Sequence, residues 1–243
     1  CRNKDLSSSC KELLQKYRSL SNGIYKLRNN ISLEEYEVYC HMTNIPGCGH
    51  GGWTLIMKID GTKPDFNYTS SYWTNNETYA VEDGLKGLTE KQSKLASYWN
   101  TPFSKICLGM KVNNVTKWIA TDHEASSLSD VITHGRYTST SFGKEAWKSL
   151  VNDSLIQVYC NYEGFNVQVE HNFNADAYIK TRIGIVANNY DQCVNCDSCI
   201  GFGISFLGCD GHKRYSSCGD ILGICTAPEN DGETAAFGYV LVQ

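Results

Sequence analysis

Twelve cysteines constrain this chain of 243 residues more than any other feature. Reducing compartments keep thiols from pairing, so cytosolic proteins of this size rarely carry so many cysteines. An even number of cysteines in a glycine-rich sequence is typical of a disulfide framework. They stand at Cys1, Cys10, Cys40, Cys48, Cys107, Cys160, Cys193, Cys196, Cys199, Cys209, Cys218 and Cys225. The sequence therefore predicts a secreted or extracellular protein.

Five Asn-x-Ser/Thr sequons favour the same compartment, because N-glycans are added along the secretory route. A single sequon arises easily by chance, whereas five sequons together with twelve cysteines indicate one location. They begin at Asn30, Asn67, Asn76, Asn114 and Asn152. The first residues after Cys1 are polar, so we expect a mature form without a signal peptide.

Several function classes are disfavoured by composition and motifs. The net charge is −4 and no basic run occurs, which argues against nucleic acid as a partner. No apolar stretch approaches the roughly 18 residues of a membrane span. The chain has no Gly-x-Ser-x-Gly motif, no paired histidine spacing for zinc and no phosphate loop. His50-Gly51-Gly52 resembles part of an oxyanion loop, but a tight turn explains it. We expect no enzyme.

Residues 40–61 combine a glycine-rich turn with a strand on each side. Apolar and polar residues alternate over 36–42, and this period of two is typical of a half-buried strand. Residues 53–59 are expected to form the second strand. Four glycines between them, at positions 47, 49, 51 and 52, allow the backbone to turn tightly.

Apolar spacing and capping signals predict the other elements. Ser9 and Glu12 form a capping-box pattern at the start of a helix that Gly23 ends. Further helices are expected at 89–99 and 143–151, and the second one should bury Trp147. The remaining strands are predicted at 24–27, 105–112, 115–120, 155–159, 165–170, 178–186 and 235–242. Asn113-Asn114 is expected to join two of them as a hairpin turn.

These elements predict an α+β fold with a central twisted antiparallel sheet, short helices and a loop-rich, disulfide-stapled C-terminal subdomain. We expect a single domain over 1–243, divided into an N-terminal subdomain (1–61), a central sheet region (62–187), a loop-rich subdomain (188–234) and a returning strand (235–243). Six cysteines and many glycines in 193–225 argue against a regular sheet there. Residues 62–88 are expected to be a solvated excursion with Trp73 exposed, and Trp53, Trp118 and Trp147 to be core.

Cys193, Cys196 and Cys199 form the sharpest local pattern, with two residues between neighbours. In a reducing compartment this spacing would indicate zinc or the first ligands of an iron–sulfur cluster. A cluster motif continues with a cysteine three residues on and then proline, whereas the next cysteine here is Cys209. Together with the sequons, this favours disulfides.

Acidic and amide side chains crowd the last part of the chain. They are Asp191, Asn195, Asp197, Asp210, Asp220, Glu229, Asp231 and Glu233. Calcium takes about six to eight oxygen ligands, and disulfide-linked loops can supply such a cage. Any one of these residues taken singly is more simply a solvated loop residue. The cluster as a whole predicts at least one calcium site, without the EF-hand pattern.

Two stretches resemble a known superfamily. The strand with Cys40-x-Met42, running into Gly-Gly-Trp-Thr-Leu at 51–55, resembles the start of a fibrinogen-like domain. Cys193 to Cys199 followed by Ile-Gly, Cys-Gly-Asp at 218–220 and Glu233 shortly before Ala-Ala resemble the intelectin branch. The resemblance covers essentially the whole chain. It implies a secreted lectin that binds microbial or cell-surface glycans in innate recognition or adhesion.

The resemblance also implies roles for individual residues. It pairs Cys10 with Cys40, because fibrinogen-like domains tie the first helix to the Cys-x-Met strand, and it pairs Cys160 with Cys193. In intelectins a calcium ion holds the vicinal hydroxyls of the sugar. The implied calcium ligands are Asp197, Asp220 and Glu233, with Asn195 and Asp210 behind them. Residues 221–232 contain no aromatic side chain, so the wall beside the sugar is drawn from Tyr215, Phe202 or Phe206.

A second class of function stays open. A structural or adhesive extracellular-matrix protein could keep the fold without a sugar site. The missing aromatic pair favours it, as does the Val-Asn-Cys-Asp-Ser segment at 194–198, where intelectins place Asn, Glu and His. A homo-oligomer through Cys1 is one alternative for that residue, and an intrachain disulfide is the other.

Overall fold

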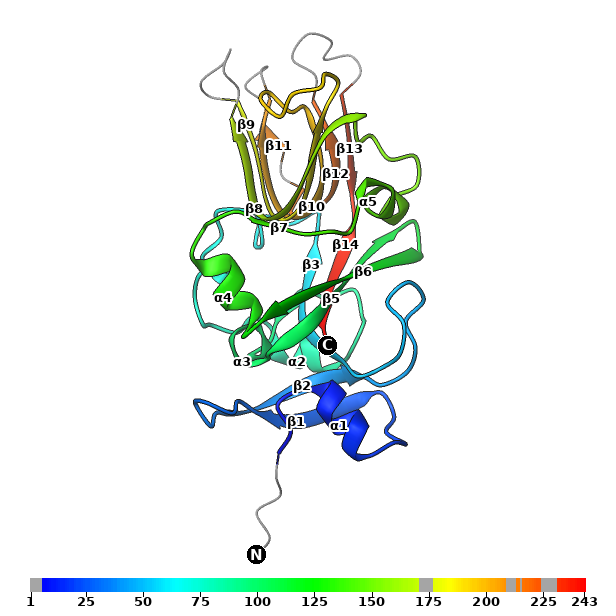
Figure 1. Cartoon of the computed structure of the whole chain (residues 1–243), viewed down its shortest axis with the longest axis vertical. Helices are drawn as coiled ribbons and strands as arrows, with labels where there is room; N and C mark the ends of the chain where they lie inside the picture. Colours follow the sequence, from blue (N-terminus) through cyan, green and yellow to red (C-terminus); the bar gives the residue numbers. More distant parts are fainter. Residues whose placement is uncertain (1–5, 171–176, 209–212, 215, 224–230) are drawn as a thin grey trace, which may run out of the picture.

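The computed structural model describes residues 6–170, 177–208, 213–214, 216–223 and 231–243. Its strands form two antiparallel sheets of seven strands each, connected by short helices. Along the long axis of Figure 1, the chain rises from its N-terminal hairpin through the first sheet to the second sheet at the top. The α+β class with antiparallel sheets and short helices is therefore confirmed.

The first sheet has the order β1-β2-β3-β14-β5-β6, with β4 beside β3. Its strands are β1 (Gly23–Arg28), β2 (Glu35–His41), β3 (Trp53–Asp60), β4 (Ser93–Lys94), β5 (Phe103–Val112), β6 (Val115–Ala125) and β14 (Phe237–Val242). The predicted strands of this part are confirmed, including the C-terminal one, which lies between β3 and β5. Asn113 and Asn114 have φ values of 49° and 65°, as a tight hairpin turn requires.

The helices are short and lie beside the sheets. They are α1 (Cys10–Lys16), η1 (Ser71–Trp73), α2 (Val81–Leu85), α3 (Ser97–Asn100), α4 (Leu128–Thr133) and α5 (Lys144–Leu150). The predicted cap of α1 is confirmed, since Ser9 Oγ accepts a hydrogen bond of 3.2 Å from the Glu12 backbone N–H. The helix ends well before Gly23, however. The helix predicted at 89–99 is wrong, because Lys94 pairs with Met57 in the sheet.

The second sheet has the order β13-β12-β10-β9-β8-β7, with β11 beside β10. Its strands are β7 (Thr138–Ser139), β8 (Tyr159–Glu170), β9 (Tyr178–Asn188), β10 (Ser198–Leu207), β11 (Lys213–Arg214), β12 (Cys218–Leu222) and β13 (Gly232–Ala235). The prediction of irregular loops over 193–225 is wrong, because β10 and β12 lie in this range. The two strands predicted at 155–159 and 165–170 are replaced by the single strand β8.

A row of glycines crosses the second sheet. Gly164 pairs with Gly184, Gly184 with Gly201, and Gly201 with Gly219. A Cβ at Gly201 would lie 2.4 Å from Thr181 Oγ1, and a Cβ at Gly184 would lie 2.7 Å from Thr181 Cγ2. Because these positions carry no side chains, strand β9 can bend sharply here, and the sheet folds along this row. In Figure 1 the second sheet accordingly curves into a U that opens at the top.

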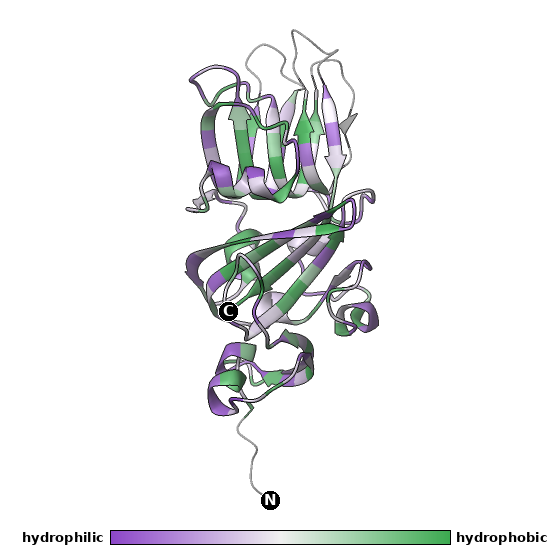
Figure 2. Cartoon of the chain, turned by 90° about the vertical axis from the view of Figure 1, so that its right-hand side faces the viewer, coloured by the Kyte–Doolittle hydropathy of each residue, from purple (hydrophilic) through white to green (hydrophobic). Residues whose placement is uncertain are grey.

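Three apolar clusters hold the molecule together, and Figure 2 shows apolar residues distributed along the strands of both sheets. The main cluster lies between the sheets and includes Ile56, Leu108, Ile183 and Ile200. A second cluster covers the other face of the first sheet, where α1 and the β1–β2 hairpin pack. The third fills the inside of the U, with Val167, Ile179 and Phe206 from one arm and Val186, Cys199 and Ile221 from the other.

Most residues of the segment 62–88 are exposed or half-buried, as predicted, but a few large side chains anchor it in the core. Trp73 is fully buried, and its Nε1 donates a hydrogen bond of 3.1 Å to the Phe66 carbonyl oxygen. The predicted exposure of Trp73 is wrong, because both aromatic side chains join the main cluster. Trp53 and Trp147 are buried as predicted, whereas Trp118 is half-buried.

The described residues contain three disulfides: Cys10–Cys40, Cys48–Cys107 and Cys160–Cys193. The first and third confirm the pairings that the resemblance implied. The second joins the glycine-rich turn to β5 and was not predicted. Cys1, and with it the predicted link between chains, lies outside the described residues. In the described part of the chain, no helix is long and apolar enough to cross a membrane.

Candidate functional site

Most of the ligands predicted from the sequence lie on one arm of the U, between the glycine row and the open end. Strands β9, β10, β12 and β13 begin or end there. Asn195 and Asp197 lie on the connection into β10, Asp220 lies on β12 and Glu233 lies on β13. Two further candidates, Asp210 and Tyr215, lie outside the described residues. The disulfide Cys160–Cys193 ties the start of β8 to the segment after β9.

Asp220 has the most unusual environment among these residues. Its side chain is fully buried, and Oδ2 accepts a hydrogen bond of 2.6 Å from the Leu155 backbone N–H. Oδ1 is buried without a hydrogen-bond partner in the described part of the chain. Burial raises the pKa of the Asp220 carboxyl to about 6, and hydrogen bonds from Leu155 and Ser154 oppose this rise. An oxygen in this state is satisfied by a proton or by a cation.

Asp197 is fixed between two strands at the same end. Its backbone N–H donates to the Ala187 carbonyl oxygen at 3.2 Å, and its own carbonyl oxygen accepts from the Gly223 N–H at 2.8 Å. The Asp197 side chain is buried as well. Asn195 has a φ of 64°, in the left-handed region that asparagine tolerates better than most residues. The backbone hydrogen bonds of Asp197 and the left-handed conformation of Asn195 therefore fix the turn that precedes β10.

Strand register separates Asp220 from Glu233. Asp220 pairs with Ile200 and Thr234, whereas Glu233 pairs with Ile221. Side chains alternate between the two faces of a sheet, so Asp220 faces the main cluster and Glu233 faces the inside of the U. Within the described ranges, no group of three or more His, Cys, Asp and Glu side chains is placed to hold a metal ion. Asp220 is the member of the predicted set with a buried carboxylate oxygen that lacks a hydrogen-bond partner among the described residues.

The two aromatic candidates on β10 are buried. Phe202 belongs to the main cluster and Phe206 to the cluster inside the U. A Cβ added to Gly238 would lie 2.7 Å from the Phe202 ring, which shows how closely β14 covers it. Neither ring offers a face to solvent, as a wall beside a sugar requires. Tyr215 is then the remaining aromatic candidate.

A polar groove, absent from the sequence-based predictions, runs around helix α4. Three neighbouring hollows of about 490, 540 and 400 Å³ form it, and each shares lining residues with the others. The shared residues are Glu124, Ala125, Ser126, Asp130 and His134. We call this the α4 groove. Its lining comes from segments far apart in the chain, so no local motif indicates it.

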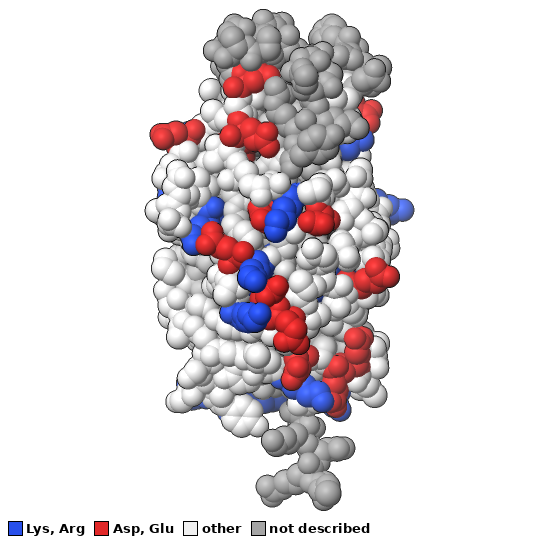
Figure 3. Space-filling model, turned by 180° about the vertical axis from the view of Figure 1, so that it is seen from behind, with Lys and Arg blue, Asp and Glu red and all other residues white. Residues whose placement is uncertain are grey.

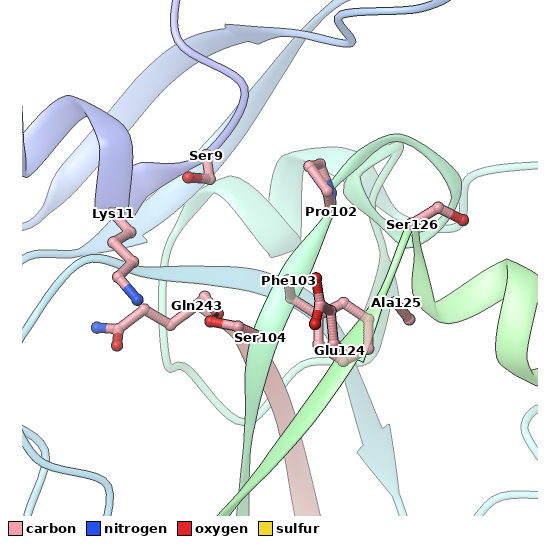
Figure 4. Close-up of a pocket in the computed structure, with 9 residues that line it drawn as sticks. All are labelled: Ser9, Lys11, Pro102, Phe103, Ser104, Glu124, Ala125, Ser126 and Gln243. Carbon is pink, nitrogen blue, oxygen red and sulfur yellow. Dashed lines mark hydrogen bonds between the residues drawn. The ribbon is translucent and has the colours of Figure 1, made fainter.

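Figure 4 shows the hollow of the α4 groove that lies nearest to α1. Lys11 from α1 and Gln243 lie on one side, and Glu124 from β6 lies with Phe103 on the other. The Gln243 amide donates to the carbonyl oxygens of His50 and Gly51 at 3.1 and 2.7 Å. Figure 3 shows acidic and basic side chains interspersed on the back of the molecule rather than gathered by sign.

The five predicted glycosylation sites lie at the surface. The side chains of Asn30, Asn76, Asn114 and Asn152 are exposed, and that of Asn67 is half-buried. Asn67 Oδ1 accepts hydrogen bonds of 3.0 Å from both the backbone N–H and the hydroxyl of Thr69. A turn of this kind brings the amide and the hydroxyl of the sequon together.

No protein-family model matches the chain. Among solved structures, the chain is similar to the fibrinogen-like globe domain of human ANGPTL2, with a TM-score of 0.38 and 12% sequence identity over 98% of each chain. Membership of the fibrinogen-related superfamily and of its intelectin branch therefore stays a hypothesis based on the motifs.

Proposed function

We propose that this protein is an extracellular recognition or adhesion domain that binds glycans in a calcium-dependent manner on the arm of the U that carries Asp220. The observation that carries the proposal is the buried Asp220 carboxyl group, whose Oδ1 has no hydrogen-bond partner among the described residues. A calcium ion supplies the positive charge that such an oxygen lacks. The same ion can coordinate two vicinal hydroxyls of a sugar, which lose little freedom because one rigid ring holds both.

The extracellular part of the proposal is supported by the cysteines and the sequons. Three disulfides join segments that are 30, 59 and 33 residues apart in the chain. Such bonds persist in oxidising compartments. The surface position of the sequons makes their asparagines available for glycosylation.

The proposed calcium ligands centre on Asp220 beside the glycine row, with Asp197 further out on the same arm of the U. Asn195, Asp210 and backbone carbonyl groups of the connections are the further oxygen donors in this proposal. Glu233 contributes least, because its strand position directs it to the other face of the sheet. No catalytic role is proposed, and the expectation of a protein without enzymatic activity stays a prediction.

Binding to a broad glycan array, in calcium and again in a chelator, tests the proposal. We expect binding to sugars with exposed vicinal diols in calcium and its loss in the chelator. Asp220→Asn should abolish this binding, while the exposed Asp191→Asn should leave it unchanged. Binding that survives the chelator would move the site away from Asp197 and Asp220.

A structural or adhesive matrix protein is the second candidate function. The burial of Phe202 and Phe206 favours it, because these rings are not available to a sugar. This candidate predicts that correctly folded protein binds no glycan on the array in either buffer. It also predicts retention on extracellular-matrix proteins, with calcium acting on stability alone.

A further inference from the structure

One sequon lies in the wall of the α4 groove. Asn76 is exposed and lines the hollow of about 540 Å³ together with Trp99 from α3. Its side-chain amide makes no hydrogen bond within the described residues. The Asn76 amide is therefore free to carry a glycan at the edge of this hollow.

Trp99 is held as a fixed wall of the hollow. Its Nε1 donates to Glu34 Oε2 at 3.4 Å, and the buried Lys94 ammonium lies 5.6 Å from the centre of the ring. The side chain is half-buried and packs against the main cluster. An indole ring fixed in this way offers a rigid apolar surface next to solvent.

The rest of the hollow is polar. Its lining side chains carry hydroxyl, carboxyl and imidazole groups and include Thr74, Ser126, Ser127, Ser129, Asp130, Thr133 and His134. His134 Nε2 lies 3.7 Å from Asp130 Oδ1. Sugars combine an apolar face of C–H groups with a rim of hydroxyls, so a rigid indole beside hydrogen-bonding side chains matches their chemistry.

We propose that Asn76 carries an N-linked glycan whose first sugars lie in this hollow against Trp99. The attachment places the sugars beside the ring at a high effective concentration, so weak contacts are enough to hold them. The glycan covers part of the α4 groove and closes that part to other ligands. This inference goes beyond the proposed lectin function and depends only on its extracellular part.

The first test uses the full chain secreted from eukaryotic cells. An endoglycosidase acts on the folded protein, and mass spectrometry follows release at each sequon. We expect the glycan at Asn76 to be released more slowly than the one at Asn114, which lies on the exposed β5–β6 turn. Trp99→Ala should raise the rate at Asn76 and leave the rate at Asn114 unchanged.

A second test leaves the lining of the hollow intact. Thr78→Ala removes the sequon of Asn76, and Thr116→Ala removes that of Asn114 as a matched control. The fluorescence of Trp99 is the part of the tryptophan signal that is lost in Trp99→Phe. We expect acrylamide to quench this signal more strongly in Thr78→Ala than in the wild type, and equally in Thr116→Ala and the wild type. This comparison holds even if Trp99→Ala fails to fold.

Three results would overturn the inference. One is equal release at Asn76 and Asn114 together with unchanged quenching in Thr78→Ala. Another is an unmodified Asn76 in a chain that is glycosylated elsewhere, which leaves the extracellular proposal intact. The third is a chain without glycan at any sequon, which contradicts both proposals.

Discussion

The two sheets bury their apolar residues in different ways. In the first sheet, the central strand β3 is buried along nearly its whole length, because separate clusters cover its two faces. The second sheet has the main cluster on one face and folds the other face onto itself. The first arrangement depends on large side chains that pack on both faces of the sheet. The second depends on glycines, because a Cβ at Gly184 or Gly201 would clash with neighbouring atoms.

This difference bears on where function resides. One face of the first sheet is covered by α1 and by the sheet's own β1–β2 hairpin, and the main cluster shared with the second sheet covers the other face. The folded second sheet has an open end where several strands begin or end. The candidate ligand Asp197 lies near this end, and Asp220 lies on the same arm beside the glycine row. In our proposal, the first sheet therefore serves as the scaffold and the folded second sheet carries the binding site.

The largest expected effect comes from filling the glycine row. In Gly201→Val the new side chain would meet Thr181 Oγ1 and the Ile183 carbonyl oxygen, which lie 2.4 and 2.6 Å from the position of its Cβ. We expect a loss of more than about 3 kcal/mol in the free energy of unfolding, or failure to fold. Urea denaturation measures it. Gly23→Ala in the first sheet, with its nearest atom 3.9 Å away, should stay within about 1 kcal/mol of wild type.

Removing disulfides compares the two sheets directly. Loss of Cys48–Cys107 in the first sheet or of Cys160–Cys193 in the second, each by double substitution to alanine, should lower the free energy of unfolding by about 4 kcal/mol. Only the second loss loosens the open end. We therefore expect glycan binding to persist without Cys48–Cys107 and to disappear without Cys160–Cys193. Equal binding by the two variants would contradict this division.

Glu163 is expected to hold the outer face of the second sheet to α5. Its carboxylate accepts hydrogen bonds from the Thr140 hydroxyl, the backbone N–H groups of Phe142 and Gly143, and Trp147 Nε1. Glu163→Gln turns an amide N–H₂ toward these donors, which should lower the free energy of unfolding by about 2 to 3 kcal/mol. Glu170→Gln, exposed on the same strand, should change it by less than about 1 kcal/mol. Chemical denaturation checks both.

Asp220 should give stability a distinct pH dependence in the absence of calcium. Its pKa rises from 3.8 to about 6 on folding, so the folded state binds more protons than the unfolded state between these values. The contribution of Asp220 to the free energy of unfolding should then fall as pH rises from 4 to above 6. Asp220→Asn removes this contribution and should be more stable than wild type at pH 7 by about 3 kcal/mol in a chelator. Parallel pH profiles for the two proteins would contradict this.

Much of the first sheet could be predicted, because β2 and β5 show clean alternation and Ser9 marks the start of α1. The glycines at 201 and 219 were interpreted as loop residues, because sequence alone does not reveal that they face each other across strands. The burial of Trp73 and the bond Cys48–Cys107 depend on contacts between distant segments, which local patterns do not contain.

The candidate site was predicted in part. The resemblance indicated Asp220, but its burial depends on Leu155, which lies 65 residues away in the chain. The opposite directions of Asp220 and Glu233 follow from strand register, which the sequence did not reveal because β12 and β13 were not predicted. The α4 groove has no signal beyond the sequon at Asn76.

Thermal unfolding in calcium and in a chelator tests the central claim most directly, since an ion that binds only the folded state raises its stability. We predict that millimolar calcium raises the Tm of the wild type by several degrees and leaves that of Asp220→Asn unchanged, with Asp191→Asn behaving like wild type. If calcium left the wild-type Tm unchanged, or raised the Tm of Asp220→Asn equally, the claim of a calcium site at Asp220 would be contradicted.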